Sequence, residues 1–273
     1  MALDLSALRN KLTELKGAAG RDHILWKPSK GDSLIRIVPL KDNPEYPFIE
    51  LYFHNLGGKT YLSPLSFNEP DPIAEFAEKL KADAGGKLPP EDWKEVKKFI
   101  PYRRTFVPMI DRNKQSQGVR FWAFGKTVYK TLAGVLTDPE YGDITDPQTG
   151  RDIKIEYTPQ DESDTGFAKT EVRVKVKVSP LTTDSDELKK LLNEQPDLMS
   201  LYKKMTYEEL QEVLENYLTP SGGTAPTRVV VNKNDEDWGE DVSESPSAVK
   251  AKAASKTTGK DVSDEFAALF EDK

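Results

Sequence analysis

Residues 102–124 read YRRTFVPMIDRNKQSQGVRFWAF, a stretch rich in rings and cations. Its two ends, 102–110 and 119–124, combine aromatic and β-branched residues with polar alternation, which is the pattern of β-strands. Because successive strand residues face opposite ways, each predicted strand has one face on which arginine alternates with rings. These faces comprise Tyr102, Arg104 and Phe106 in the first strand, and Arg120, Trp122 and Phe124 in the second.

The chain on either side of this stretch continues the strand pattern, with short helices between strands. Strand-like alternation recurs at residues 34–38, 48–53, 59–62, 153–157 and 170–178. Apolar residues at helical spacing predict helices at 72–81, 90–99, 126–136, 184–194 and 206–218. We therefore predict a mainly β protein with helical additions, whose core is a small OB-fold-like β-barrel or strongly bent sheet.

Composition excludes several classes of chemistry. The 273 residues include no cysteine, which excludes disulfides, thiol catalysis and thiolate metal sites. His23 and His54 are the two histidines, too few for a multi-histidine metal centre. The N-terminus has no apolar run long enough for a signal peptide or a membrane span, so we expect a soluble intracellular protein.

Enzyme motifs are missing as well. Gly125-Lys126-Thr127 resembles the end of a phosphate-binding loop, but Arg120 stands where that motif needs a glycine. The dinucleotide-binding, zinc-protease and serine-hydrolase motifs do not occur in the sequence. Carboxylates are abundant but spread over predicted loops and helix surfaces, where they are usually solvated. We therefore expect no enzymatic activity.

Charge is sorted along the chain. The net charge is -7, from 39 basic and 46 acidic side chains. Residues 94–130 nevertheless carry ten basic side chains and two acidic ones, whereas residues 234–273 carry eleven acidic side chains and five lysines. An acidic protein thus contains a strongly basic segment and ends in an acidic tail.

The basic segment has the residue mixture of a single-stranded nucleic-acid site. Such sites track phosphates with Lys and Arg and stack bases on aromatic faces. A second basic strip, Lys169, Arg173, Lys175 and Lys177, lies at the predicted strand 170–178, and Val172, Val174, Val176 and Val178 are expected to form a core face opposite it. The alternative interpretation of each ring is an ordinary position in the strand core. Two rival functions also remain at this point, an RNA-binding regulator and a non-catalytic protein-interaction scaffold.

Both ends of the chain differ from the middle in composition. Residues 220–260 are rich in Ser, Gly, Pro, Ala, Lys and acids, which predicts a flexible linker. The segment 261–273 follows, with apolar residues on one face of a short acidic helix, and we interpret it as a docking peptide. Residues 3–16 predict an amphipathic helix that packs either on its own domain or on a neighbouring molecule.

At these residues the chain resembles the single-stranded-DNA-binding proteins of T-even-type bacteriophages. The resemblance covers roughly residues 31–180. It is carried by Leu34-Ile-Arg-Ile-Val-Pro39, Arg103-Arg104-Thr105, the Phe124-Gly125-Lys126 turn and Gly166-Phe167. It implies an OB-fold core at 21–219, a cooperativity arm at 1–20 for self-association along DNA, and an acidic partner-binding tail at 220–273.

The resemblance also implies function and partners. It implies sequence-tolerant binding and protection of single-stranded DNA in phage replication, recombination and repair, in the cytoplasm of the infected host. Tail residues that would recruit replication and recombination proteins are Asp264, Glu265, Phe266, Leu269 and Phe270. Expected phosphate contacts are Arg103, Arg104, Arg112, Lys114, Arg120, Lys126, Lys175 and Lys177, and expected stacking platforms are Tyr102, Phe106, Trp122 and Phe167.

The zinc ion of that family is not expected here. The family's Cys-Pro-x-Cys corresponds to Asp71-Pro72-Ile73-Ala74, with His54 at the place of the histidine ligand. Since all thiolates are missing, we predict no cofactor and a structural His54. Apolar packing then has to hold this region, through Phe53, Tyr61, Ile73, Phe76 and Leu80.

Overall fold

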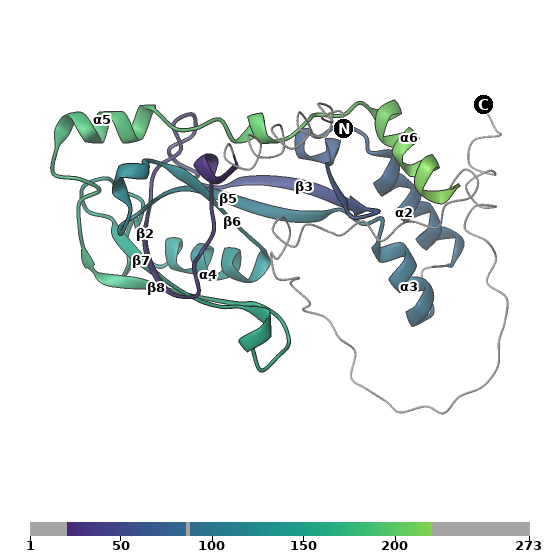
Figure 1. Ribbon diagram of the computed structural model, residues 1–273, viewed down its shortest axis with the longest axis horizontal. Helices are drawn as coiled ribbons and strands as arrows, with labels where there is room; N and C mark the ends of the chain where they lie inside the picture. Colours follow the sequence, from purple (N-terminus) through teal and green to yellow (C-terminus); the bar gives the residue numbers. More distant parts are fainter. Residues whose placement is uncertain (1–20, 86–87, 220–273) are drawn as a thin grey trace, which may run out of the picture. The chain divides into compact units, whose positions relative to one another are not determined.

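The structure is a computed structural model that describes residues 21–85 and 88–219. In this part of the chain the β-branched and aromatic runs form an eight-stranded mixed sheet (Figure 1). The strands are β1 (Leu25–Trp26), β2 (Gly31–Ile37), β3 (Ile49–Leu56), β4 (Lys59–Leu62), β5 (Tyr102–Asp111), β6 (Arg120–Phe124), β7 (Arg151–Thr158) and β8 (Lys169–Val178). The predicted arm 1–20 and tail 220–273 lie outside the described residues.

The sheet follows the order β1-β6-β5-β2-β7-β8, and β3 pairs with β4 and β5. β1 runs parallel to β6, whereas β2 is antiparallel to both β5 and β7. Within the described strands this path has two ends, β1 and β8, so the sheet is open. The mainly β class with helical additions is thus confirmed, but the predicted closed OB-like barrel is not.

The described residues form two compact units, which we treat separately. Unit 1 comprises residues 21–51 and 103–203, and unit 2 comprises residues 52–85, 88–102 and 204–219. The chain therefore leaves unit 1 within β3 and returns to it within β5.

The main core of unit 1 forms where strand register places apolar side chains opposite one another. Ile37 lies opposite Met109, and Trp122 lies opposite Val107. Helix α4 (Lys126–Leu136) adds Val128 and Leu132, one turn apart on its buried side. The cluster comprises Trp26, Ile35, Ile37, Phe48, Val107, Met109, Trp122, Phe124, Val128, Leu132, Ile144, Ile153 and Ile155.

A second apolar cluster in unit 1 buries other positions of the same strands. It joins Ile110 of β5 and Val119, which precedes β6, to Leu191 of helix α5 (Ser185–Asn193). Asp184 caps α5 by accepting hydrogen bonds from the N–H groups of Asp186 and Glu187. Since strand residues alternate between faces, the two clusters together bury β5 on both sides.

Unit 2 carries helices α2 (Pro72–Asp83), α3 (Pro90–Lys97) and α6 (Tyr207–Leu218) (Figure 1). Asp71 caps α2, and a capping box of Thr206 and Glu209 begins α6. The buried cluster of this unit comprises Leu56, Ile73, Phe76, Ala77, Val96, Phe99, Leu210 and Leu214, with Tyr61 and Leu80 packed against it. The predicted packing is thus confirmed except for Phe53, which is buried outside this cluster, with its ring 5.9 Å from that of Tyr102.

Short 3₁₀ turns connect several of these elements. They span Pro64–Phe67, Gln115–Gln117, Gln160–Glu162 and Leu198–Leu201. None of the helices in residues 21–85 and 88–219 is long and apolar enough to cross a lipid bilayer.

Candidate nucleic-acid interface

Helix α4 presents cations on the side away from the core of unit 1. It begins directly after β6, and Gly125 is its N-cap. Because Val128 and Leu132 face inward, Lys126 and Lys130, also one turn apart, are exposed. Tyr129 lies between them and packs partly against the main cluster. The helix therefore offers on its outer side one half-buried ring and two cations that form no ion pair with any other described residue.

The segment before β3 brings a second tyrosine to this ring. Phe48 is buried and packs edge-on against Tyr129, with ring centroids 5.1 Å apart. Tyr46 stacks edge-on against Phe48 at 5.5 Å, yet 42% of its surface is exposed. The hydroxyl groups of Tyr46 and Tyr129 lie 3.3 Å apart. Buried Phe48 thus holds two tyrosines side by side at the surface.

An arginine and a carboxylate complete this arrangement. The guanidinium of Arg103, on β5, lies over the Tyr129 ring with its Cζ 4.9 Å from the centroid. It donates from Nη1 to Oε2 of Glu50, on β3, at 2.9 Å. Tyr46 donates from its hydroxyl to Oε1 of Glu50 at 3.1 Å. We call Tyr46, Glu50, Arg103 and Tyr129 the ring–arginine cluster.

The tyrosine hydroxyl in this cluster stays protonated. Burial, the hydrogen bond with Tyr129 and the charge of Glu50 all raise the pKa of Tyr46 above its ordinary value. Tyr46 is therefore a neutral donor at physiological pH, and its side chain is accessible at the surface.

Strand β8 supplies a second set of exposed cations. Lys169 and Arg173 both pair with Glu171 on the same strand. Lys175 and Lys177 are exposed, and within the described residues neither forms an ion pair. The predicted basic strip is therefore present, but its two free cations lie toward the end of the strand.

The valine face of β8 is only partly as predicted. Val172 and Val174 pack against the main cluster, whereas Val176 is 83% exposed. The register between β7 and β8 shifts between Arg151 and Ile153, so β8 bulges around Val176. Arg151 donates to the Val176 carbonyl and holds the bulge. The expectation that all four valines form core was wrong at this bulge.

Two further predicted residues lie on exposed loops. Phe167 is 45% exposed in the loop between β7 and β8. Lys114 is exposed in the turn that follows β5, where its N–H bonds the Asp111 carbonyl. Both side chains are accessible to a ligand.

Two predicted stacking platforms, Phe106 and Trp122, are not accessible. Their exposed fractions are 2% and 1%, respectively. Trp122 packs against Phe124 and Trp26 inside the main cluster, and Phe106 packs edge-on against Tyr202. The assignment of these rings to base stacking is corrected, because a base cannot reach a ring that is covered on both faces.

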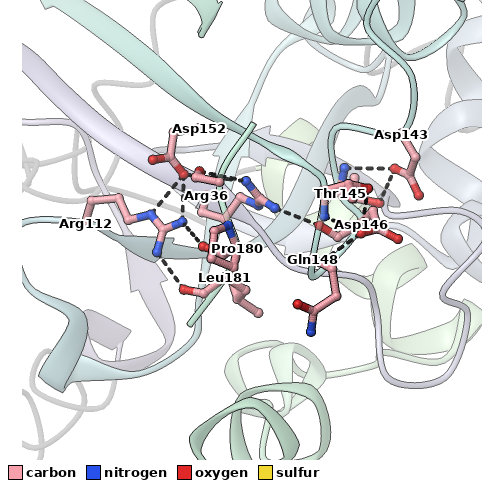
Figure 2. Close-up of polar contacts among 11 residues, drawn as sticks. Arg36, Arg112, Asp143, Thr145, Asp146, Gln148, Asp152, Pro180 and Leu181 are labelled. Atoms are coloured by element: carbon pink, nitrogen blue, oxygen red, sulfur yellow. Dashed lines mark hydrogen bonds and ion pairs between the residues drawn. The ribbon is translucent and has the colours of Figure 1, made fainter. Parts of the chain in front are cut away.

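Arg112 is likewise a scaffold residue rather than an exposed cation. Its Nε and Nη2 bond Oδ1 of Asp152 at 2.9 and 2.8 Å. Nη1 donates to the carbonyl of Leu181 at 2.6 Å, and Nη2 donates to that of Pro180 at 2.9 Å (Figure 2). The guanidinium therefore ties β7 to the chain that leaves β8, which corrects its assignment to phosphate binding.

Arg36 lies beside this pair and is fully buried. Nη2 donates to the carbonyl of Asp146 at 2.7 Å, and Nη1 lies 3.6 Å from Oδ1 of Asp152 (Figure 2). Burial lowers the pKa of Arg36 to about 10, although Asp152 opposes this shift. We call Arg36, Arg112, Asp146 and Asp152 the buried arginine network.

A glycine makes room for this network. A Cβ at Gly150 would lie 2.5 Å from Nη2 of Arg36 and 2.5 Å from the Asp146 carbonyl oxygen. A side chain at this position is therefore incompatible with the position of the buried guanidinium.

The remaining predicted site residues are half-buried. Arg120 lies with Nη2 4.0 Å from Oδ2 of Asp111, and burial lowers its pKa. Arg104 is also half-buried, on β5. Tyr102 belongs to unit 2, where its ring faces Phe53. The structure thus brings Arg103 into the ring–arginine cluster, whereas Arg120 lies beside Asp111.

His54 lies in a buried polar cluster in unit 2. Its Nε2 is 2.9 Å from Oδ2 of Asp71, which also accepts a hydrogen bond from the Ser63 hydroxyl. The other carboxylate oxygen of Asp71 accepts the N–H groups of Ile73 and Ala74 at the start of α2. Burial raises the pKa of Asp71, but the bonds from His54, Ser63 and Ala74 together bring it below its ordinary value.

This cluster does not fit a zinc ion. Both oxygens of Asp71 are occupied by hydrogen bonds within the protein, and the second cysteine position of the family motif is Ala74. Among the residues that the structure describes, no group of three His, Cys, Asp or Glu side chains is placed to hold a metal ion. His54 instead joins β3 to the N-terminus of α2.

Sequence reasoning overlooked Tyr46 and Glu50. Tyr46 stands in DNPEYPFIE, between two prolines and outside any predicted strand, so no periodicity marked it. An aromatic residue in a turn-rich segment is nevertheless a signal, because loops lie at the surface. Glu50 resembled an ordinary polar position of an alternating strand.

Comparison with known proteins identifies the family of the chain. A search of curated proteins found no match. A family model described as "gp32 DNA binding protein like" matches residues 29–218, well over half of the chain and nearly all of both units. The chain therefore belongs to the gp32-like DNA-binding protein family, in agreement with the resemblance to the single-stranded-DNA-binding proteins of T-even-type phages.

Proposed function

We propose that unit 1 binds single-stranded DNA without sequence preference, through the ring–arginine cluster and the exposed cations around it. The observation that carries this proposal is the position of Tyr46, Tyr129 and Arg103, in a chain of a DNA-binding family. Exposed tyrosines stack bases of any identity, and a guanidinium beside them pairs with a phosphate. The cluster combines both functions within hydrogen-bonding distance.

Several other residues extend this proposed surface. Lys126 and Lys130 on α4, Lys114 after β5, and Lys175 and Lys177 on β8 are exposed cations of unit 1. Phe167 is the exposed ring between β7 and β8. Tyr102, Arg104 and Arg120 remain proposed contacts with smaller accessible surfaces. Each cation that neutralises a phosphate adds to the salt dependence of binding.

The wider role follows the family. We propose that the protein protects single-stranded intermediates of phage DNA replication, recombination and repair in the cytoplasm of the infected host. Residues 1–20 would mediate self-association along DNA. Residues 264–270 would recruit partner proteins. The acidic tail 234–273, as a polyanion, would compete with DNA for the basic surface of unit 1. Deletion of residues 234–273 should then increase DNA affinity.

The direct test is fluorescence anisotropy of labelled oligo-dT over a series of salt concentrations. We expect saturable binding. The slope of log affinity against log salt should be about -0.7 for each phosphate neutralised. A Tyr46→Leu, Tyr129→Leu double variant should bind several-fold more weakly. Tyr217→Leu is the matched control, because Tyr217 is a comparably exposed tyrosine in unit 2.

Three outcomes have distinct meanings. Absence of salt-dependent binding to oligo-dT would overturn the proposal and favour an interaction scaffold. Stronger binding to oligo-U than to oligo-dT would indicate an RNA-binding protein. Equal weakening by the double variant and by the Tyr217 control would show that the ring–arginine cluster is not the stacking site.

A further inference from the structure

Glu50 is an acid at the centre of a surface that should attract phosphates. Each of its carboxylate oxygens accepts one hydrogen bond, Oε1 from Tyr46 and Oε2 from Arg103. Glu50 therefore fixes both the ring and the cation of the cluster. Neither side chain of the ion pair is deeply buried, since 33% of the Arg103 side chain and 24% of the Glu50 side chain are exposed.

The carboxylate occupies only part of the guanidinium. Arg103 uses Nη1 for Glu50, and within the described residues it makes no other hydrogen bond or ion pair. A guanidinium has five N–H donors in a planar fork, which fits a phosphate as well as a carboxylate. The contact with the Tyr129 ring holds this guanidinium beside the exposed tyrosines.

We propose that Glu50 is an internal competitor for the DNA phosphate. It holds Arg103 and Tyr46 in place in the free protein, and Arg103 exchanges the carboxylate for a phosphodiester oxygen when single-stranded DNA binds. This inference rests on the proposed function. Glu50 would thus be a positioning residue that also weakens DNA binding, because the incoming phosphate and the carboxylate carry like charges.

The exchange has a consequence for ion release. When a phosphate takes Arg103, Glu50 loses its cationic partner and attracts a cation from solution. Part of the counterion release from the DNA is then cancelled. The wild-type salt dependence should therefore fall short by about one phosphate of what the cations at the surface would give.

Glu50→Gln tests this inference by anisotropy with labelled oligo-dT. Gln keeps an acceptor oxygen for the cluster but removes the charge. We expect binding to become about twofold to fivefold tighter at low salt, the range for a partly exposed ion pair. The slope of log affinity against log salt should become more negative by about 0.7. Glu194→Gln is the control, because Glu194 pairs with Lys190 on the exposed surface of α5.

Repeating the Glu50→Gln test in an Arg103→Met variant shows whether Glu50 acts through Arg103. In Arg103→Met, the change of slope caused by Glu50→Gln should disappear. Glu50→Ala should lose part of the gain seen with Gln, because it also frees Tyr46. Circular dichroism and thermal unfolding of each variant verify that the fold is retained.

The outcomes separate this inference from the function on which it rests. Salt-dependent binding by the wild type, with unchanged affinity and slope in Glu50→Gln, would overturn the inference alone. An equal gain in Glu50→Gln and Glu194→Gln would also overturn it, since net charge would then be the cause. If no variant binds oligo-dT, the proposed function fails together with it.

Discussion

Strand β5 begins and ends beside arginines with opposite environments. Arg103 lies near its first residue and stacks on Tyr129, with a third of its side chain exposed. Among the residues that the structure describes, Glu50 is its one carboxylate partner. Arg112 follows its last residue, is 11% exposed, and divides its donors between Asp152 and two backbone carbonyls. The same residue type thus contacts solvent at one end of the strand and fixes the chain at the other.

The difference lies in the partners rather than in the distance along the chain. Backbone carbonyls cannot leave a folded structure, so a guanidinium bound to them is committed to the scaffold. A carboxylate near the surface can exchange its cation for another ion. The buried arginine network should therefore control stability, and the ring–arginine cluster should control binding.

Gly150→Ala should have the largest effect. The new Cβ would meet the Asp146 and Ile144 carbonyl oxygens as well as Arg36, so backbone has to move. We expect a loss of about 3 kcal/mol or more in the free energy of unfolding, measured by urea denaturation. The control is Gly134→Ala on α4, where a Cβ has open space. Because alanine favours the helix over glycine, it should increase the free energy of unfolding by about 0.5–1 kcal/mol. Similar behaviour of both variants would show that the network tolerates displacement.

Arg103 and Arg112, at the two ends of β5, should differ next in their effects on stability and on DNA affinity. Arg112→Met should lower the free energy of unfolding by about 2–3 kcal/mol, because Asp152 and two carbonyls lose their donor. Arg103→Met should cost less than about 1 kcal/mol of stability. The affinity for oligo-dT should fall in Arg103→Met. In Arg112→Met it should stay unchanged at temperatures at which that variant is folded. The reverse pattern would contradict the comparison.

Exposed and buried rings should show the same contrast in binding. Tyr46→Leu should weaken oligo-dT binding by roughly 1 kcal/mol, the lower end of the range for a base-stacking contact. Trp122→Phe should leave that affinity unchanged, because the ring is inaccessible, and should instead lower stability by about 2 kcal/mol. Loss of affinity in folded Trp122→Phe would show that a change of packing in the main core alters the binding surface.

The smallest predicted effect is that of acid on stability, through Asp146 of the buried arginine network. The N–H groups of Thr149 and Gln148 lower the pKa of Asp146 below its ordinary value of 3.8. Because the folded pKa is the lower one, the stabilisation is present above pH 3.8 and is lost as the pH falls below it. Asp146→Asn should therefore flatten the decline in stability as the pH falls below about 4. The free energies of unfolding of both proteins can be measured by urea denaturation at each pH, and an equal decline in the two would contradict this prediction.

Elements with strong periodicity could be predicted from the sequence. Helix α4 begins and ends at the predicted residues, because Val128 and Leu132 mark its buried side and Gly125 its start. Strand β1 was not predicted, because two residues are too short to show a period, and its pairing with β6 depends on tertiary contact.

The site was less predictable than the fold, for a physical reason. Alternation reports which residues share a face, but not whether that face is covered. Trp122 and Phe106 were assigned to an open face, and a second layer of packing buries them. Arg112 and Arg103 look alike in sequence, since their partners Asp152 and Glu50 come from strands far away along the chain.

The interrupted path of the chain has a consequence for synthesis on the ribosome. β2 is made early, but Ile35 finds its neighbours Asp111 and Ile153 only after residues 52–102 have been translated as part of unit 2. Closing such long loops is slow, and unpaired strand edges stay open to other chains in the meantime. Unit 1 should therefore complete its sheet only late in translation, once β8 has left the exit tunnel.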